Sequence, residues 1–413
     1  MSLEAKLFYI DNDNSCSYEQ LIARLNNTDR VITNLYRFNQ LDFFVNLMAG
    51  IVADLDMVLL DNDFSESEVR SLCGSPYEIN SICIPKLNLI GEVDLVERIL
   101  NSSSKLKLFT SGTTGLPKSV VHSVAALTRN VKCDERFRGN TWGFAFNSTH
   151  MAGIQVFFQA LINRNTIVNI FAKSKEQVYK SIEMFGITHI SATPTFFRLL
   201  IPSPKSYPTV NQITFGGEKS DSFLHQKVRN IFPKASIRNV YASTEAGALF
   251  ASKDDIFSIP ENIKEKIRIV DGELFIHKTL LGTSSLFNDQ YTWYGTGDKV
   301  EFLDDNLQHF RIVGRNSEMI NVGGYKVNPN EVESRLREMS GIVESKVYGI
   351  PNSVLGNILC VDIVRSDSSI TEVVIRNFLS ETLQPYKVPR RVFFVNAISL
   401  SRTGKIERKN YEK

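Results

Sequence analysis

Apolar and polar residues along the chain follow the spacings of short strands and of helices. Apolar runs bounded by turn-forming residues predict strands at 57–60, 166–171 and 189–192, and a helical pattern covers 175–185. Strands that alternate with helices are typical of a mixed or parallel sheet covered by helices. We therefore predict a fold of the α/β class, built from layered sheets and helices.

The pattern changes near Arg315. The segment before it is rich in turns, whereas short strands and helices alternate after it. The roughly 100 residues that remain are enough for a small α+β domain. We predict a large N-terminal domain at 1–314 and a small C-terminal domain at 315–413. The C-terminal elements are predicted at 330–339 and 372–383 (helices) and at 344–348 and 358–364 (strands).

Charge and composition exclude some classes of partner. The 413 residues include 47 basic and 45 acidic side chains, for a net charge of +2. This balance gives no electrostatic reason to expect nucleic-acid or membrane binding, so an anionic ligand must be held by local groups. The most apolar window, residues 43–53, is shorter than the roughly 20 residues that span a bilayer. We interpret it as a core segment.

The chain start and the cysteines indicate a compartment. Residues 1–4 do not begin the basic-then-apolar pattern of a secretory signal. The 5 cysteines are odd in number, scattered and form no CxxC pair, which argues against a disulfide framework and against a zinc site. A cytoplasmic protein is expected.

One stretch, from Phe109 to Ser119, reads FTSGTTGLPKS. Its glycines let the backbone approach an anion, its hydroxyls donate hydrogen bonds, and its lysine adds a compact positive charge. It differs from the GxxxxGK[ST] loop of nucleotide hydrolases because Pro117 stands at the second required glycine. The stretch therefore predicts a polyphosphate site of another kind. The residues expected to contact the phosphates are Thr110, Ser111, Gly112, Thr113, Thr114, Gly115 and Lys118.

This loop resembles the signature of the adenylate-forming family, roughly [YF]TSGTTGxPKG, in which only Ser119 departs from the pattern. The family includes acyl- and aryl-CoA synthetases, nonribosomal-peptide adenylation domains and firefly luciferase. The resemblance implies that the loop binds ATP. It also implies a large adenylate-forming domain followed by a small mobile lid. Since only 108 residues precede Phe109, fewer than in most members, the N-terminal subdomain is expected to be compact.

Residues 239–245, with the sequence NVYASTE, resemble the family's NxYGxTE segment. The resemblance implies that Tyr241 stacks on adenine, that Thr244 touches the α-phosphate and that Glu245 holds Mg²⁺. A hard cation needs an oxygen ligand and neutralises phosphate charge. Ala242 departs from the usual glycine. The other ATP-binding residues implied here are Asn239, Gly216, Gly217 and Glu218.

Residues 147–153 resemble the HxxG segment of acyl- and aryl-acid members. In the family its histidine, here His150, borders the carboxylate pocket, and a satisfied core histidine is the alternative. Amino-acid-activating members place an aspartate near this segment, and none occurs between Trp142 and Gly153. A carboxylic acid without an α-amino group is therefore favoured. Four aromatic residues are either pocket or core residues: Phe157, Phe158, Phe196 and Phe197.

Two further segments complete the resemblance. Residues 294–298 match the family's YxTGD motif, which implies that Asp298 binds the ribose hydroxyls. Residues 403–406 resemble the end of the PxTxSGK[ILV] motif, which implies that Lys405 bridges the substrate carboxylate and the α-phosphate. Between these two segments, residues 314–327, with the sequence GRNSEMINVGGYKV, resemble the family's hinge segment, and Ser317 departs from the usual aspartate or lysine. The resemblance implies that Arg315 contacts ribose or phosphate, that Ser317 is the hinge, and that Gly323 and Gly324 line the CoA tunnel.

The family resemblance implies an acid–thiol ligase that uses ATP and Mg²⁺, with CoA as co-substrate. Its catalytic residues would be Lys405, Thr244, Glu245 and His150. One alternative is a ligase that loads the phosphopantetheine of a carrier protein. Another is a non-catalytic nucleotide- or acyl-binding protein, which the three departures from the family pattern suggest. The acid stays open among aryl acids, o-succinylbenzoate and fatty acids.

Overall fold

The chain forms two compact units. The first comprises residues 1–217, 228–253 and 277–294, and the second comprises 218–227, 254–276 and 295–413. The predicted boundary at 314/315 stays a prediction. The computed structural model describes residues 6–12, 14–73, 81–110, 118–284, 287, 292–304, 309–322, 325–352, 356–400 and 406.

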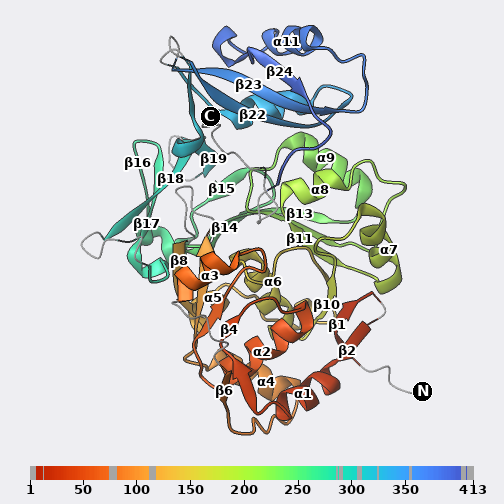
Figure 1. Cartoon of the computed structure of the whole chain (residues 1–413), viewed down its shortest axis with the longest axis vertical. Helices are drawn as coiled ribbons and strands as arrows, with labels where there is room; N and C mark the ends of the chain where they lie inside the picture. The colour runs from red at the N-terminus through yellow and green to blue at the C-terminus, as the bar shows by residue number, and fades with distance from the viewer. Residues whose placement is uncertain are drawn as a thin grey trace. The chain divides into compact units, whose positions relative to one another are not determined.

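The first unit is built around an eight-stranded sheet (Figure 1). Its six inner strands are parallel, and the two edge strands run antiparallel to their neighbours. This arrangement confirms the predicted α/β class. In spatial order the strands are β14 (Gly247–Ser252), β13 (Ser236–Ser243), β12 (Gln212–Gly216), β11 (His189–Ala192), β9 (Thr141–Phe144), β10 (Thr166–Asn169), β1 (Leu7–Asp11) and β2 (Asn14–Ser17).

Two smaller sheets and most helices also belong to this unit. The smaller sheets are β4 (Asn34–Leu35), β5 (Met57–Leu59), β7 (Lys105–Thr110) and β8 (Lys118–Ser123), and the pair β3 (Arg30–Ile32) and β6 (Ser81–Cys83). The helices are α1 (Tyr18–Asn26), α2 (Gln40–Val52), α3 (Glu66–Cys73), α4 (Glu92–Leu100), α5 (Val124–Thr128), α6 (Met151–Ile162), α7 (Lys175–Phe185) and α8 (Pro194–Leu199), with the 3₁₀ turn η1 (Glu135–Phe137).

The apolar window at 43–53 forms most of α2 and is buried, as predicted. Phe44 stacks on Phe157 of α6, with ring centroids 4.5 Å apart, and meets Phe144 of β9 edge to face. Buried aromatic pairs of this kind add to the stabilisation from apolar area alone. No helix among the described residues is long and apolar enough to cross a membrane.

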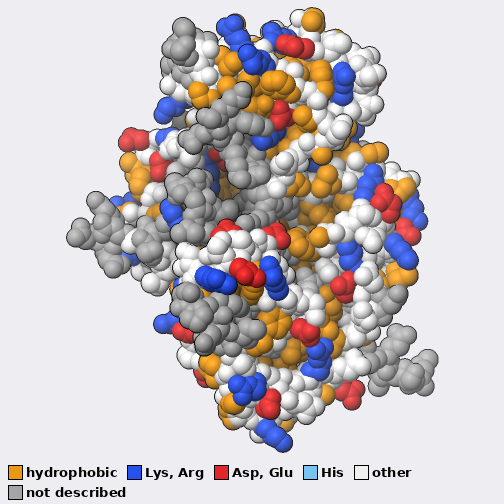
Figure 2. Space-filling model, in the orientation of Figure 1, with side chains coloured by type: hydrophobic (Ala, Val, Ile, Leu, Met, Phe, Trp, Pro, Cys, Tyr) orange, Lys and Arg blue, Asp and Glu red, His pale blue; other side chains and the backbone are white. Residues whose placement is uncertain are grey.

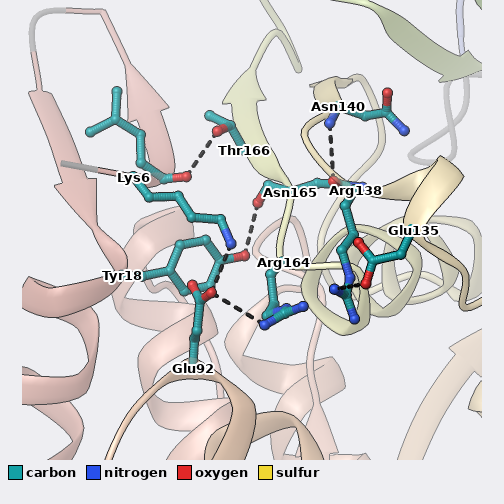
Figure 3. Close-up of polar contacts among 10 residues, drawn as sticks. Lys6, Tyr18, Glu92, Glu135, Arg138, Asn140, Arg164, Asn165 and Thr166 are labelled. Atoms are coloured by element: carbon teal, nitrogen blue, oxygen red, sulfur yellow. Dashed lines mark hydrogen bonds and ion pairs between the residues drawn. The ribbon is translucent and has the colours of Figure 1, made fainter. Parts of the chain in front are cut away.

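The start of the chain is fixed to the sheet by polar contacts (Figure 3). The buried hydroxyl of Tyr18 donates to the carbonyl of Asn165 at 2.9 Å. Beside it, Glu92 of α4 pairs with Lys6 at 2.8 Å and with Arg164 at 3.5 Å. Burial raises the pKa of Tyr18 well above its ordinary value, so this hydroxyl stays a neutral donor.

The second unit contains two further sheets. The five-stranded sheet has the order β15 (Ile256–Ser258), β19 (His309–Arg315), β18 (Trp293–Phe302), β17 (Glu273–His277) and β16 (Ile267–Val270). The C-terminal sheet has the order β21 (Tyr325–Val327), β20 (Ile320–Val322), β23 (Gly356–Arg365) and β22 (Ile342–Asn352), and β24 (Arg391–Phe394) pairs with β23. The unit also has the helices α10 (Pro329–Arg337) and α11 (Glu372–Ser380), and the 3₁₀ turns η2 (Glu261–Lys266), η4 (Asn316–Glu318) and η5 (Pro385–Lys387).

Two elements cross the border between the units. They are α9 (Ser222–Ile231) and the β17–β18 hairpin, whose connection contains the 3₁₀ turn η3 (Lys278–Leu280). On the face shown in Figure 2, basic and acidic side chains are interspersed over the described surface. No single-sign patch gathers there, in agreement with the small net charge.

Acid is expected to destabilise the first unit through His189 of β11. This ring packs against Trp142, and burial lowers the pKa of His189 to about 4. An unfolded histidine titrates near 6.5, so between about pH 6.5 and pH 4 the unfolded chain binds the extra proton and stability falls as the pH falls. The loss is about 3 kcal/mol over this window.

Urea unfolding at several pH values checks this expectation. A His189→Gln variant has no imidazole to protonate, so its stability is expected to fall less steeply between pH 6.5 and pH 4. Equal slopes for the variant and the wild type would contradict the assignment.

Candidate active site

The carboxyl ends of the parallel strands carry several residues that the sequence singled out. A loop at 147–150 follows β9, β12 ends at Gly216, and β13 leads into Thr244 and Glu245. Ligands of open α/β sheets bind at this edge, where the strand order reverses. The chain goes from β9 to β10 on one side and then to β11 on the other side of β9. The reversal therefore lies beside the loop that contains His150.

His150 is the residue before α6 and is paired with a buried carboxylate. Its Nε2 lies 2.7 Å from Oδ2 of Asp61, which follows β5. The other carboxylate oxygen, Oδ1, accepts hydrogen bonds from Asn147 Nδ2 and from the backbone N–H of Asp63, both at 3.1 Å. Only 4% of the Asp61 side chain is exposed. The pair thus fixes the imidazole at the carboxyl edge of the sheet.

The charge state of Asp61 follows from its surroundings. Burial raises the pKa of Asp61. The hydrogen bond and charge of His150, together with the other donors, lower it by a larger amount, so the pKa lies below the ordinary value. Asp61 is therefore an anion at neutral pH. Since a carboxylate only accepts, Nε2 of His150 carries the proton of this hydrogen bond.

Gly153 keeps the loop against α6. A Cβ atom at this position would lie 2.2 Å from the carbonyl oxygen of Asn147. On the other side of the loop, Gln40 of α2 donates to Ser148 Oγ at 3.0 Å. The histidine loop is therefore held from α2, from Asp61 and from its own helix.

The predicted phosphate loop connects two antiparallel strands. Thr110 ends β7, Lys118 begins β8, and the two residues are paired across the ladder. Lys118 is exposed at the mouth of this hairpin. The predicted ligands Ser111, Gly112, Thr113, Thr114 and Gly115 lie outside the described residues, as does the side chain of Thr110.

The predicted adenine and glycine residues lie on neighbouring strands. Gly216 pairs with Val240 of β13, and Gly217 has a φ of +83°, a conformation that favours glycine. Tyr241 stacks on Phe250 of β14, with ring centroids 5.5 Å apart and an interplanar angle of 20°. Asn239 is buried in β13.

The turn that contains Thr244 and Glu245 is supported from three other segments. His122 Nε2 lies 2.7 Å from the Thr244 carbonyl oxygen, the Gly282 N–H donates to the Glu245 carbonyl at 2.8 Å, and Arg129 donates to Ala246 at 2.6 Å. Burial lowers the pKa of His122, and its hydrogen bond to Thr244 offsets this in part. The sequence analysis missed both His122 and Arg129.

The second unit contains the predicted ribose ligand. Asp298 of β18 is buried, and its Oδ1 accepts a hydrogen bond from Arg315 Nε at 2.7 Å. Glu273 of β17 accepts from the N–H of Gly297 at 3.1 Å and from Asn316 at 2.8 Å. The structure therefore brings two predicted residues together as an ion pair at the end of β19.

The remaining predicted residues of this unit are placed as follows. Ser317 lies in η4, directly after β19. Glu218 Oε1 accepts from the N–H of Ile406 at 3.2 Å, so the residue that follows Lys405 lies beside Glu218. Lys405, Gly323 and Gly324 lie outside the described residues.

Two models of known protein families match this chain. The AMP-binding enzyme family matches residues 102–270, and the C-terminal domain of AMP-binding enzymes matches residues 331–405. The chain belongs to the adenylate-forming AMP-binding enzymes. It is therefore an enzyme of the AMP-forming ligase type.

Relatives of this family match almost the whole chain. A 2-succinylbenzoate–CoA ligase of Staphylococcus epidermidis is 23% identical over 98% of this chain and 94% of its own length. A D-alanine–D-alanyl carrier protein ligase of Staphylococcus aureus is 27% identical over 88% of this chain and 86% of its own.

Solved structures share the fold. ATP-bound MatB from Rhodopseudomonas palustris has a TM-score of 0.75 at 17% identity and covers 98% of this chain and 95% of its own. The o-succinylbenzoate CoA synthetase from Bacillus subtilis, in complex with the acyl-adenylate OSB-AMP, has a TM-score of 0.71 at 19% identity with the same coverages. These likenesses confirm the predicted two-domain fold.

The described residues fit the Mg²⁺ that adenylate-forming enzymes use. Glu245 lies in a turn and is only partly buried, and no hydrogen bond or ion pair joins its carboxylate to another described side chain. No cluster of three or more potential ligands occurs in the described ranges. Mg²⁺ is usually held by one or two carboxylates together with substrate phosphates and water, so a single carboxylate at this edge fits it.

Two departures from the family pattern are accommodated by strands. Ser119 pairs with Phe109 in the β7–β8 ladder, and its carbonyl accepts a hydrogen bond from Ser284. Ala242 lies opposite Ala248 where the β13–β14 register shifts. Ser119 therefore replaces the usual glycine within regular pairing, and Ala242 replaces it at a β-bulge-like irregularity.

The aromatic candidates for the acyl pocket divide into two groups. Phe157, Phe158 and Phe197 are fully buried and belong to the core. Phe196 of α8 is partly exposed, which leaves it as the pocket candidate. The three core residues lie in helices that follow parallel strands, and their side chains are buried between packed layers. A sequence pattern cannot distinguish such core residues from residues that line a pocket.

Removing the charge of Asp298 is expected to weaken ATP binding. In an Asp298→Asn variant, Arg315 loses its anionic partner and the ribose loses a charged acceptor, and a hydrogen bond to a charged group contributes about 1.5–3 kcal/mol. We expect KM for ATP to rise about tenfold or more in pyrophosphate exchange.

Asp304→Asn is the matched control for this measurement. Asp304 lies beyond the end of β18 and pairs with His309 at 2.6 Å. A KM for ATP in Asp298→Asn that equals the control value would contradict the ribose assignment.

Proposed function

We propose that this enzyme converts a carboxylic acid to its acyl-adenylate and passes the acyl group to the thiol of CoA. The observation that carries the proposal is that the loop of His150, Gly216 and the Thr244–Glu245 turn stand at the carboxyl ends of parallel strands of the eight-stranded sheet, where Asp61 pairs with His150. The near full-length match to a 2-succinylbenzoate–CoA ligase supports it.

In the first step, the substrate carboxylate oxygen attacks the α-phosphorus of ATP, and the bond to the pyrophosphate oxygen breaks. Mg²⁺, when bound, neutralises charge on the separating phosphates. Lys118 lies where the phosphate loop ends, and Thr244 lies at the strand edge beside Glu245. In this proposal Lys405 spans the carboxylate and the α-phosphate, and positioning with charge neutralisation supplies most of the rate.

In the second step, a thiol attacks the adenylate carbonyl. The thioester forms, the bond to the phosphate oxygen breaks, and AMP leaves. We infer that the C-terminal domain, residues 315–413, rotates at Ser317 between the steps, so that Lys405 withdraws and Gly323 and Gly324 line the path of the thiol.

The acid we propose has no α-amino group. The carboxylate nearest His150 is Asp61, and its oxygens already accept from Asn147, His150 and the backbone of Asp63. One acceptor site of Oδ2 is not used by these three bonds, but only 4% of the Asp61 side chain is exposed, so a substrate ammonium would have little access to it. This favours an aryl or fatty acid over an amino acid.

A carrier-protein acceptor is the second candidate. The 27% identity to a D-alanine–D-alanyl carrier protein ligase favours it, because that relative covers most of the chain. In this version the first step is unchanged and a phosphopantetheine thiol takes the place of CoA. In either version the cysteine pattern supports a reducing cytoplasm as the location.

AMP release with Mg²⁺-ATP and a panel of aryl, fatty and amino acids, each with and without CoA, tests the proposal. Release that requires one acid and CoA together supports the CoA ligase and gives its acid class. Acid-dependent pyrophosphate exchange that CoA leaves unchanged points to the carrier-protein acceptor.

A further inference from the structure

Three consecutive carbonyl groups, those of Thr244, Glu245 and Ala246, each accept a hydrogen bond from a different part of the first unit. The donors are His122 of β8, the backbone of Gly282, and Arg129, which follows α5. The turn also closes on itself, because the N–H of Ala246 donates to Ser243 Oγ at 3.2 Å. Buried carbonyl groups need partners, and because three separate segments supply them here, the position of the turn depends on all three.

The ring of His122 is hydrogen-bonded to the turn and is also enclosed by neighbouring residues. Its side chain is buried, with a relative exposure of 4%. A Cβ atom on Gly282 would lie 2.6 Å from Cε1 and 2.7 Å from Nε2 of its ring, so only glycine fits beside it. Because a carbonyl oxygen only accepts, Nε2 is the protonated nitrogen of this imidazole. The ring therefore has one position and one tautomer for this contact.

The same strand leads directly from the phosphate loop. β8 begins at Lys118 and reaches His122 four residues later. Val121 exchanges two backbone hydrogen bonds with Thr283, both 2.8 Å long, which joins β8 to the segment that contains Gly282. The strand after the phosphate loop and the turn that contains Glu245 thus form one bonded assembly.

We infer that His122 is a positioning residue that fixes the Glu245 turn relative to the phosphate loop, so that the carboxylate meets a divalent cation on the bound polyphosphate. The inference rests on the proposed function. It assigns to His122 and, in second place, to Arg129 a role in metal binding through the backbone of the turn, without contact to the cation or the nucleotide.

Mn²⁺ binding, followed by electron paramagnetic resonance, tests this with the full-length protein and a non-hydrolysable ATP analogue. His122→Leu removes the donor, and we expect it to raise the dissociation constant of Mn²⁺ in the nucleotide complex about tenfold. His122→Gln keeps an N–H donor of similar reach and should stay within about threefold of wild type. Metal-free AMP binding should weaken less than Mn²⁺ binding in His122→Leu, because Thr244, whose carbonyl His122 holds, is only one of the contacts expected for AMP.

Two controls and one substitute variant complete the experiment. His189→Gln alters a different, partly buried histidine and should leave Mn²⁺ binding unchanged. Glu245→Gln should abolish the site, and if it matches wild type the metal assignment itself fails, independently of His122. If His122→Leu does not fold, Arg129→Met is measured instead, because it releases the Ala246 carbonyl, and weaker Mn²⁺ binding is again expected.

Wild-type Mn²⁺ affinity in folded His122→Leu, or in Arg129→Met if that variant is needed, would overturn the inference. Equal losses of Mn²⁺ and AMP affinity would also overturn it, because they indicate a general structural defect. Weaker Mn²⁺ binding alone, restored by glutamine, would support it.

Discussion

Replacing Lys405 by alanine is expected to lower the rate of acid-dependent ATP–pyrophosphate exchange by about 100- to 1000-fold. The reason is that charge builds up on the oxygens around the α-phosphorus as the carboxylate attacks, and a positioned ammonium lowers the energy of that state. The N–H of Ile406, the next residue, donates to Glu218, which follows the glycine pair at the end of β12.

The second half-reaction separates this role from a general defect. With synthetic acyl-adenylate supplied, Lys405→Ala should still form thioester at a rate close to wild type, because in the proposed mechanism the lysine acts only in adenylation. Lys409→Ala, which removes the same charge from the same terminal segment, is the control. Full exchange activity in Lys405→Ala would rule out its assigned role.

Changing Asp61 to asparagine is expected to reduce kcat/KM for the acid by about 10- to 100-fold. This is the cost of removing a carboxylate that orients a metal-ligating histidine, and Asp61 is hydrogen-bonded to His150 in a comparable way. Asparagine has nearly the same size but no charge, so His150 loses the anion 2.7 Å from its Nε2. KM for ATP should change little, because Asp61 contacts the loop that contains His150 and none of the described residues that are predicted to bind ATP.

A double-mutant cycle shows whether Asp61 acts through His150. If it does, Asp61→Asn should cost little activity in a His150→Ala background, because the two residues then work as one unit. Asp63→Asn, on the same loop but exposed, is the matched control. Additive losses in the cycle would contradict the coupling and leave Asp61 a purely structural role.

Local sequence signals placed several of the regular elements of the fold. The predicted helix 175–185 has the bounds of α7, because Ser174 and Gln177 form a capping box and Gly186 ends the helix with a φ of +60°. The predicted strand 189–192 likewise matches β11. The predicted strand 344–348 is longer in the structure, as β22 at Ile342–Asn352, because pairing with β23 extends it beyond the apolar run.

The partners of the site residues could not be predicted in the same way. Asp61 lies 89 residues before His150, and His122 lies 122 residues before Thr244. Each contact depends on which strands become neighbours, and spacing along the chain does not encode that. The one local signal was that Asp61 directly follows a predicted strand. In α/β folds, functional side chains commonly lie just after the carboxyl end of a strand.

Acid-dependent ATP–pyrophosphate exchange by the wild-type protein tests the central claim most directly. The account predicts that at least one acid of an aryl and fatty acid panel drives exchange, that the exchange requires Mg²⁺, and that it proceeds without CoA. A folded protein that binds ATP but catalyses no exchange with any acid, amino acids included, would contradict the account.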